Sequence, residues 1–164
     1  MQDHVATILE QWQRQVPELN VSPVGVFGRV TRIERYKTTA LREVYRRHHI
    51  DAGEYDVLAA LRRTGPPHLL TPTELARGVL VKSGTMTERV DRLEQRGFVE
   101  RARSTRDRRS VSVELTTAGR ELVDDAAADL VATQARLLEG LAEPDRQALA
   151  ELLATLCSLL ERDA

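Results

Sequence analysis

Apolar side chains recur at a helical spacing of three and four residues along most of this chain. A stretch with two prolines and a glycine, PELNVSPVGV, predicts a linker near the N-terminus. In the helix that follows, Val30, Ile33, Leu41 and Val44 are spaced for one buried face. Outside the middle of the chain, the spacing predicts five helices: residues 3–16, roughly 26–48, 51–63, about 117–138, and a last one that opens at Glu143.

Residues 70–97 predict two short helices separated by a turn. Thr71 and Glu74 have the spacing of a capping box, and Pro72 suits the first helical position. Ser83 can cap the second helix. The apolar face of the second helix is formed by Met86, Val90 and Leu93. Its leading turn and opposite face offer hydrogen-bonding side chains: Lys82, Ser83, Thr85, Thr87, Glu88 and Arg92.

Alternation of apolar and polar residues replaces the helical spacing after this pair. Residues 98–103 and 110–115 predict two strands joined by a polar turn, where five arginines and one acid, Asp107, give a net charge of +4 over residues 101–109. Two short helices and a basic ribbon form a winged helix, whose second helix enters the DNA major groove while the ribbon reaches phosphate or the minor groove. We expect DNA contacts from Lys82, Ser83, Thr85, Thr87, Arg92, Arg103, Arg106, Asp107, Arg108 and Arg109.

The composition restricts the class of protein. The chain has 164 residues, 41% hydrophobic and 30% charged, which is typical of one folded domain with a sizeable core. Its net charge is only −1, so affinity for nucleic acid must come from local segregation of charge. Such segregation is present, because residues 28–50 carry a net charge of +5 and residues 120–164 carry −6.

Other sequence features indicate where the protein works. The single cysteine, Cys157, favours a reducing compartment, and no apolar run approaches the roughly 20 residues that cross a bilayer. The N-terminus lacks a secretory signal, so we expect a cytoplasmic protein that contacts no membrane. The sequence has no Gly-rich phosphate loop, H-E-x-x-H pair, cysteine cluster or G-x-S-x-G elbow. We therefore expect no catalytic residues, no metal and no cofactor.

The last helix carries a wide leucine stripe, formed by Leu149, Leu152, Leu153, Leu156, Leu159 and Leu160. Together with the N-terminal helices, this stripe suits a homodimer interface, although a bundle within one chain is an alternative. We expect Cys157, beside the stripe, to be buried. The chain is then one domain over residues 1–164, in which 1–50 and 117–164 are dimerisation helices and 51–116 form the DNA-binding lobe.

The block VDRLEQRGFVERARSTRDRRSVSVELTTAG, with LTPTELA before it, resembles the MarR family of bacterial transcriptional regulators. Asp107 and Arg109 match the D-x-R of the family's wing, and Leu115, Thr116 and Gly119 match its L-T-x-x-G. The resemblance implies a mainly α fold with a small β-wing, and a homodimer that binds a palindromic operator in double-stranded DNA. The two recognition helices would lie about 34 Å apart. It also implies that Arg109 contacts DNA and that Asp107 orients it.

Four residues are similar to the branch of that family that responds to urate or trans-aconitate: Trp12, Asp56, Arg89 and Arg101. The resemblance implies a small organic anion effector, such as urate or trans-aconitate, that packs against Trp12 and pairs with Arg89 and Arg101. Asp56 would repel a fully ionised ligand, or would hold an arginine when the site is empty. Capture of Arg89 by the anion would tilt the recognition helix and release DNA, as expected of a repressor.

Other interpretations remain open from the sequence. Trp12 could be a packing anchor and Asp56 a surface carboxylate, and Arg89 and Arg101 could bind phosphate in a DNA-binding protein without an effector. The winged lobe could also bind protein, as part of a helical interaction module.

Overall fold

A computed structural model describes residues 3–79, 86–103 and 111–162 of the chain. It is mainly α-helical with one small antiparallel sheet, which confirms the expected winged-helix fold class. Its elements are α1 (His4–Gln15), α2 (Ser22–Arg47), α3 (Ala52–Arg63), β1 (Leu69–Leu70), α4 (Pro72–Gly78), α5 (Met86–Gln95), β2 (Val99–Arg103), β3 (Val111–Leu115), α6 (Thr117–Leu137) and α7 (Glu143–Arg162). Within the described ranges, no helix is both long and apolar enough to cross a bilayer.

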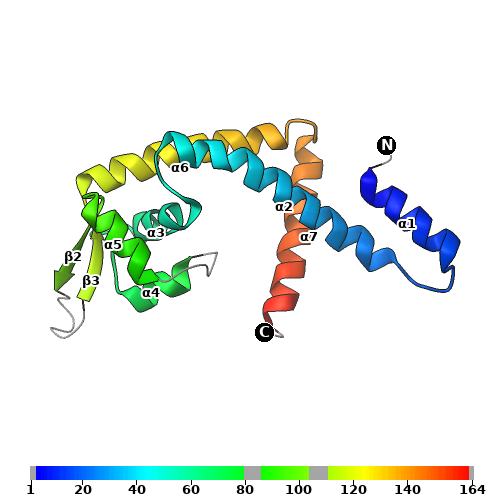
Figure 1. Ribbon diagram of the computed structural model, residues 1–164, viewed down its shortest axis with the longest axis horizontal. Helices are drawn as coiled ribbons and strands as arrows, with labels where there is room; N and C mark the ends of the chain where they lie inside the picture. Colours follow the sequence, from blue (N-terminus) through cyan, green and yellow to red (C-terminus); the bar gives the residue numbers. More distant parts are fainter. Residues whose placement is uncertain (1–2, 80–85, 104–110, 163–164) are drawn as a thin grey trace.

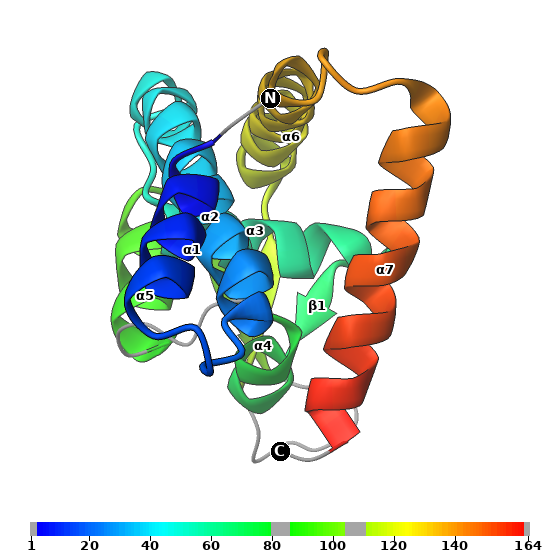
Figure 2. The ribbon, with the colours of Figure 1, turned by 90° about the vertical axis from the view of Figure 1, so that its right-hand side faces the viewer.

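The helices divide the molecule into a lobe and an extended helical part (Figure 1). Helices α3, α4 and α5 and the sheet gather at one end, below α2 and α6. Helix α1 lies beside the opposite, N-terminal half of α2, and α7 projects away from the end of α6. Seen along α2, helices α1 and α7 lie on different sides of it (Figure 2). Helix α1 is therefore separated from the lobe by much of the length of α2.

The lobe encloses the main hydrophobic core, between α3, α4, α5 and the sheet. Its buried side chains include Val57, Leu58, Leu61, Leu75, Val90, Leu93, Val99, Val113 and Val123. Met86 packs against the same core, which confirms the apolar face predicted for α5. A second cluster joins α2 to α6 through Leu41, Val44 and Leu130, with Tyr45 and Tyr55 packed against it.

Capping interactions fix the ends of the lobe helices. The Thr71 hydroxyl accepts a hydrogen bond from the Glu74 N–H at 3.3 Å, and the Glu74 carboxylate accepts one from the Thr71 N–H at 2.8 Å. This confirms the predicted capping box of α4. Thr116 caps α6, because its hydroxyl accepts a hydrogen bond from the Gly119 N–H at 3.0 Å. The predicted cap of α5, Ser83, lies outside the described residues.

The sheet confirms the predicted ribbon and adds one strand. Strands β2 and β3 pair antiparallel from Val99 opposite Leu115 to Arg103 opposite Val111. On its other edge, β3 pairs with β1, so the strand order is β1-β3-β2. The sequence did not predict β1, because two residues are too few to show alternation.

Helix α2 begins at Ser22, inside the stretch predicted to be a linker. A proline in the first turn of a helix loses no hydrogen bond, so this sequence is compatible with an earlier start. Helix α1 packs antiparallel on this part of α2. A Cβ at Gly28 would lie 3.1 Å from Val5, and a Cβ at Gly25 would lie 3.4 Å from Leu9.

Several apolar residues predicted to be buried are exposed in the single chain. Leu41 and Val44 are buried as predicted, but Val30 and Ile33 are exposed because α6 covers only the C-terminal part of that face. Helix α7 buries no side chain, and Cys157 is exposed, contrary to our expectation. The leucine stripe therefore does not form a core within one chain. An apolar face of this size calls for a covering partner.

Candidate nucleic-acid and effector site

The recognition helix α5 lies on the first turn of α3 through arginines spaced at i, i+3 and i+7. The first, Arg89, is only 7% exposed and packs against Gly53. A Cβ at Gly53 would lie 2.5 Å from the Arg89 guanidinium, so only glycine allows this approach without a shift. The position of Arg89 therefore depends directly on the backbone of α3.

The next two arginines, Arg92 and Arg96, contact the buried carboxylate of Glu54. The Arg92 Nε donates to Glu54 Oε1 at 3.0 Å, and the Arg96 Nη1 donates to Oε2 at 3.2 Å. Arg92 also pairs with Asp51 at 3.1 Å, and Arg96 donates to the His49 carbonyl at 2.6 Å. Glu54 is in addition the capping-box partner of Asp51 at the start of α3. We call Glu54, Arg92 and Arg96 the α3–α5 clamp, since they fix the recognition helix on α3.

Asp56, one half-turn beyond Glu54 on α3, lies in a strongly charged environment. It is partly buried, and burial raises the pKa of its carboxyl above the ordinary value. The positive charges of Arg89, Arg63 and Lys37 act in the opposite direction on that pKa. The predicted proximity of Asp56 and Arg89 therefore exists in the fold. Lys37 also pairs with Glu34 at 2.6 Å, and Arg63 donates to the Gly78 carbonyl at 3.1 Å. An anion that approached this cluster would therefore compete with these partners as well as with Asp56.

Arg101, the third predicted effector residue, lies elsewhere. It lies on β2 and forms ion pairs with Asp91 and Glu94 on α5. Asp91 follows Arg89 by two residues, which is about 200° around a helix. In this conformation Arg101 is therefore held on the side of α5 that faces away from Arg89.

Trp12, the fourth predicted effector residue, is 45% exposed on α1. Its helix contacts the N-terminal half of α2, where Arg29 also pairs with Asp3 at 2.8 Å. Figure 1 shows α1 at the far end of α2 from α3 and α5. The structure brings together Asp56 and Arg89, and it brings neither Arg101 nor Trp12 to them.

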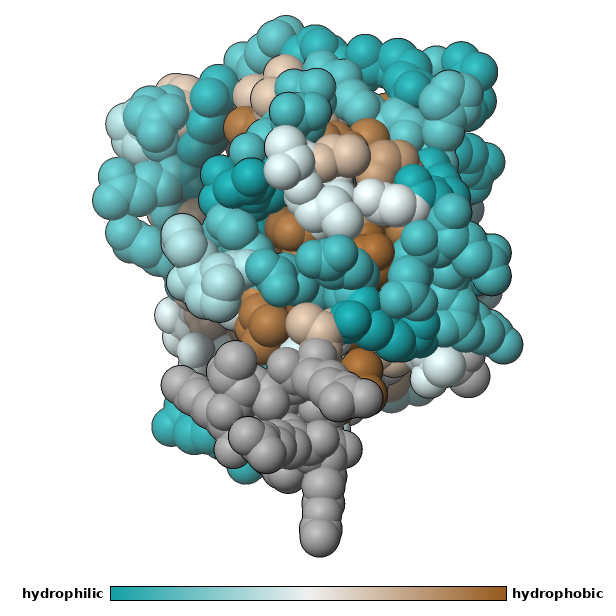
Figure 3. Space-filling view, turned by 90° about the vertical axis from the view of Figure 1, so that its left-hand side faces the viewer, coloured by the Kyte–Doolittle hydropathy of each residue, from teal (hydrophilic) through white to brown (hydrophobic). Residues whose placement is uncertain are grey.

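Only some of the residues predicted to contact DNA lie in the part of the chain that the structure describes. Thr87 is exposed on α5, Arg92 belongs to the α3–α5 clamp, and Arg103 ends β2. Lys82, Ser83, Thr85, Arg106, Asp107, Arg108 and Arg109 lie outside the described residues. Figure 3 shows the end of the molecule that carries the wing lobe, where hydrophilic side chains cover most of the described surface.

Sequence reasoning missed three residues of the site: Gly53, Glu54 and Arg96. The D-x-x-E spacing of Asp51 and Glu54 signals a capping box, but the ion pairs of Glu54 join residues about forty positions apart. Nothing in the local pattern reveals contacts over such a separation.

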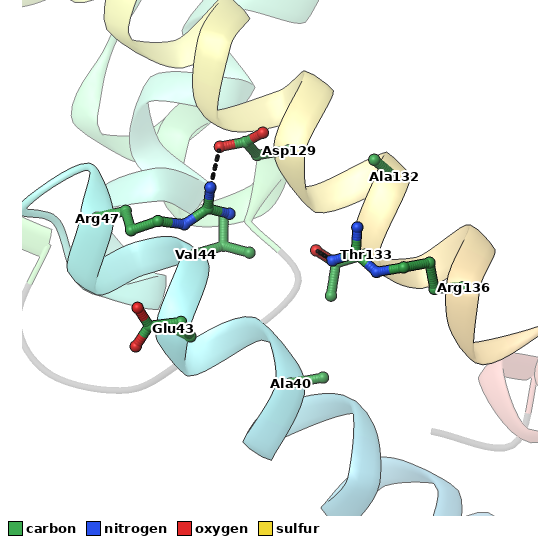
Figure 4. A pocket seen from close by; sticks show the side chains of 8 residues that line it. All are labelled: Ala40, Glu43, Val44, Arg47, Asp129, Ala132, Thr133 and Arg136. Atoms are coloured by element: carbon green, nitrogen blue, oxygen red, sulfur yellow. Dashed lines mark hydrogen bonds and ion pairs between the residues drawn. The ribbon is translucent and has the colours of Figure 1, made fainter.

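A separate pocket of about 300 Å³ lies between α2 and α6 (Figure 4). Its arginines already have partners, since Arg47 pairs with Asp129 at 3.2 Å and Arg136 donates to the Thr133 hydroxyl at 2.9 Å. Glu43 adds another negative charge to its lining. The carboxylates of Asp129 and Glu43 therefore balance the arginines that line this pocket.

Known proteins similar to this chain match the elements that form the site. A model of the MarR family matches residues 50–111, which include α3, α4, α5 and β2. The transcriptional regulator PecS of Dickeya dadantii is 34% identical over 149 residues, which cover 91% of this chain and 90% of PecS. The chain belongs to the MarR family.

Solved structures of MarR-family regulators share the fold. A regulator from Streptomyces coelicolor in complex with DNA superposes with a TM-score of 0.73, at 22% identity, over 85% of this chain and 88% of that one. BpsR of Bordetella bronchiseptica, whose DNA binding is regulated by 6-hydroxynicotinic acid, superposes with a TM-score of 0.70, at 23% identity, over 80% of this chain and 92% of that one. The chain thus has the fold of DNA-binding transcriptional regulators, with no membrane-spanning helix in its described residues.

Proposed function

We propose that this protein is a homodimeric repressor that a small organic anion releases from a palindromic operator. The observation that carries the proposal is the position of Arg89. It is a buried arginine of the recognition helix, packed against Gly53 and within electrostatic reach of Asp56. A ligand that binds Arg89 therefore acts on the element that reads DNA. BpsR, a structural relative regulated by 6-hydroxynicotinic acid, supports an organic acid as the effector class.

The anion acts by competing with Asp56 for Arg89. In the empty site, the partly buried carboxylate of Asp56 balances part of the positive charge around it. An incoming anion pairs with the Arg89 guanidinium in its place, and Lys37 and Arg63 supply further positive charge. Arg89 must then leave its place against Gly53, which shifts α5 relative to α3. The anion releases DNA because it binds this shifted state more tightly.

Arg101 joins the mechanism through the wing. Its ion pairs with Asp91 and Glu94 tie β2 to α5, so a shift of α5 also displaces the base of the wing. If Arg101 exchanges these carboxylates for the anion, as the family resemblance implies, the effector moves both DNA-contacting elements together. Urate and trans-aconitate are the anions that we propose to test first.

DNA affinity arises from the leading turn of the recognition helix and from the wing arginines. The proposed phosphate contacts are Lys82, Arg103, Arg106, Arg108 and Arg109, and the proposed base-edge contacts are Ser83, Thr85 and Thr87. Asp107 orients Arg109. Arg92, which is bound to Glu54 and Asp51, contributes by positioning the helix and can reach DNA only after leaving the clamp.

Binding to DNA from the protein's own promoter region tests the proposal, at two salt concentrations and with or without each anion. Five or more phosphate contacts predict a fall in affinity of about 10³-fold between roughly 50 and 200 mM salt. Release by urate or trans-aconitate at constant salt supports the effector. Binding that no anion disturbs favours a DNA-binding protein without an effector. Absence of salt-sensitive binding favours the protein-interaction module.

A further inference from the structure

Strand β2 carries an arginine at a position where the sheet calls for an apolar side chain. Residues directly opposite each other on antiparallel strands lie on the same face of the sheet. Val99 therefore shares a face with Leu115, and Arg101 shares that face with Val113. The three apolar residues of this face are buried in the core of the lobe. Arg101 thus lies on the inner face of the sheet, although it is charged.

Two carboxylates of the recognition helix α5 bind this arginine. The Arg101 guanidinium donates one hydrogen bond to Asp91 and another to Glu94. Glu94 also accepts a hydrogen bond from the backbone N–H of Arg101 at 3.0 Å. We call Asp91, Glu94 and Arg101 the α5–β2 bridge. Because Glu94 binds the main chain as well as the side chain of Arg101, it fixes the strand itself on α5.

The bridge lies where the sheet changes from three strands to two. Strand β1 pairs with β3 at Glu114 and Val113, and Val113 is also the residue opposite Arg101. From there to Arg103 opposite Val111, the described part of the ribbon consists of β2 and β3 alone, and Figure 1 shows it extending beside α5. A two-stranded ribbon is only marginally stable by itself. The contacts at its base must therefore set its direction.

The base of the ribbon is held at two separate points. At the first, the Thr116 hydroxyl donates to the Gly97 carbonyl at 2.8 Å, and the Arg96 guanidinium lies over the Phe98 ring. The second point is Arg101, three residues farther along, which is about 10 Å in a strand that rises roughly 3.3 Å per residue. One point alone would allow the ribbon to swing. The second point fixes its direction relative to α5.

We propose that Glu94 is a positioning residue for DNA binding: with Asp91, it sets the direction of the wing relative to the recognition helix. The carboxylate lies on α5 and binds β2, so it holds the two DNA-contacting elements in one relative orientation. A wing that is already oriented loses less conformational freedom when DNA binds. This inference rests on the proposed DNA contacts of the wing and is independent of the effector.

Removal of Glu94 distinguishes this role from that of a plain surface charge, because the two predict opposite signs. A carboxylate near DNA repels phosphate, so loss of a plain surface charge would strengthen operator binding. Loss of a positioning residue weakens it, since the ribbon loses its second point of attachment. Glu94→Ala removes both acceptor oxygens, and alanine is the residue most favoured in helices, so the variant should fold.

The test is a double-mutant cycle on operator affinity at one salt concentration, using the full-length chain. A wing variant has alanine at Arg106, Arg108 and Arg109. We expect Glu94→Ala to weaken binding about tenfold when the wing is intact, and by less than about twofold in the wing variant, because Glu94 acts through those arginines. Glu100→Ala is the matched control. It removes the same charge from the exposed neighbour of Arg101 and should not weaken binding.

Two outcomes of the cycle would overturn the proposal. Equal weakening by Glu94→Ala with and without the wing arginines would mean a general loss of structure. Tighter binding by Glu94→Ala would mean that Glu94 is only a surface charge. If the wing variant binds as tightly as the unaltered protein, the proposed wing contacts are wrong, and the direction of the ribbon is then decided without DNA.

A nitroxide label on Val111→Cys, with Cys157→Ser in the background, measures the ribbon in the free protein. Val111 is exposed on β3 and lies beyond the bridge. We expect the paramagnetic resonance spectrum to show a more mobile label in Glu94→Ala and an unchanged one in Glu100→Ala. An unchanged label in Glu94→Ala would overturn the positioning role, whatever the operator affinities.

Discussion

At the scale of single residues, the account depends on the contact between Gly53 and Arg89. The guanidinium occupies the space that a Cβ at position 53 would need, with the nearest atoms 2.5 Å from that Cβ. Because the neighbour is the end of a flexible side chain, a methyl group there would displace Arg89 rather than the helix backbone. Position 53 therefore controls the position of Arg89 in the absence of any anion.

Gly53→Ala should weaken operator binding about tenfold, or roughly 1.4 kcal/mol, because it displaces Arg89 as the anion does. Alanine is otherwise favoured over glycine in a helix, so the variant should fold. Operator titration without effector measures the change. Gly140→Ala, where an added Cβ meets open space, is the control and should bind like the unaltered protein. Equal affinity of the two variants would contradict the proposed role of Arg89.

The sequence identified some residues of the candidate site and missed others. Asp56 and Arg89 were identified through the family resemblance, and their proximity exists in the fold. Gly53 was missed because a glycine in the first turn of a helix gives no local signal of what lies against it. Trp12 was identified as a site residue, but no pattern along the sequence could indicate that α1 and α3 lie at opposite ends of α2 (Figure 1).

At the scale of elements, the α3–α5 clamp holds the recognition helix in place. Glu54 is buried and accepts hydrogen bonds from Arg92, Arg96 and the Asp51 N–H. Arg96 also lies over the Phe98 ring, 4.9 Å from its centre, so the clamp extends to the start of the wing. Removing the charge of Glu54 leaves two arginines without their main partner.

We expect Glu54→Gln to lower the free energy of unfolding by about 2 kcal/mol, since hydrogen bonds to charged groups carry contributions of this size. It should also weaken operator binding, because α5 loses its fixed position on α3. Urea unfolding and operator titration measure the two effects. Glu121→Gln, at an exposed position of α6, provides the comparison and should change neither. Unaltered operator affinity in Glu54→Gln would show that the clamp does not position the helix.

The elements also show which local signals are reliable. The capping box of α4, the apolar face of α5 and the alternation of β3 predicted their elements because each signal is local. The start of α2 and the strand β1 were missed. A proline suits both a linker and a first helical turn, and β1 is defined only by its pairing with β3.

At the scale of the whole molecule, helix α7 and the N-terminal half of α2 expose apolar faces that the single chain does not cover. Leu152 is 70% exposed and Ile33 is 58% exposed, although their spacing is that of buried positions. The sequence predicted the stripes but not which of them the chain covers by itself. The proposed homodimer would cover both stripes.

Leu152→Glu should shift the protein to monomers, because a charge in an apolar interface is strongly unfavourable. Operator affinity should fall by about a hundredfold or more, since a monomer loses the effective concentration of two linked lobes. Analytical ultracentrifugation and operator titration measure these changes. Ala154→Glu, on the opposite side of α7, is the matched control. A Leu152→Glu protein that remains dimeric would place the interface elsewhere.

The measurement that tests the central claim most directly is operator affinity with and without trans-aconitate and urate, for the unaltered protein, Arg89→Ala and Arg136→Ala. Arg136 lies in the separate pocket between α2 and α6 and serves as the control arginine. We predict that at least one anion weakens operator binding of the unaltered protein and of Arg136→Ala by about tenfold or more. The same anion should leave the affinity of Arg89→Ala unchanged. Release of Arg89→Ala to the same extent as the unaltered protein would contradict the account.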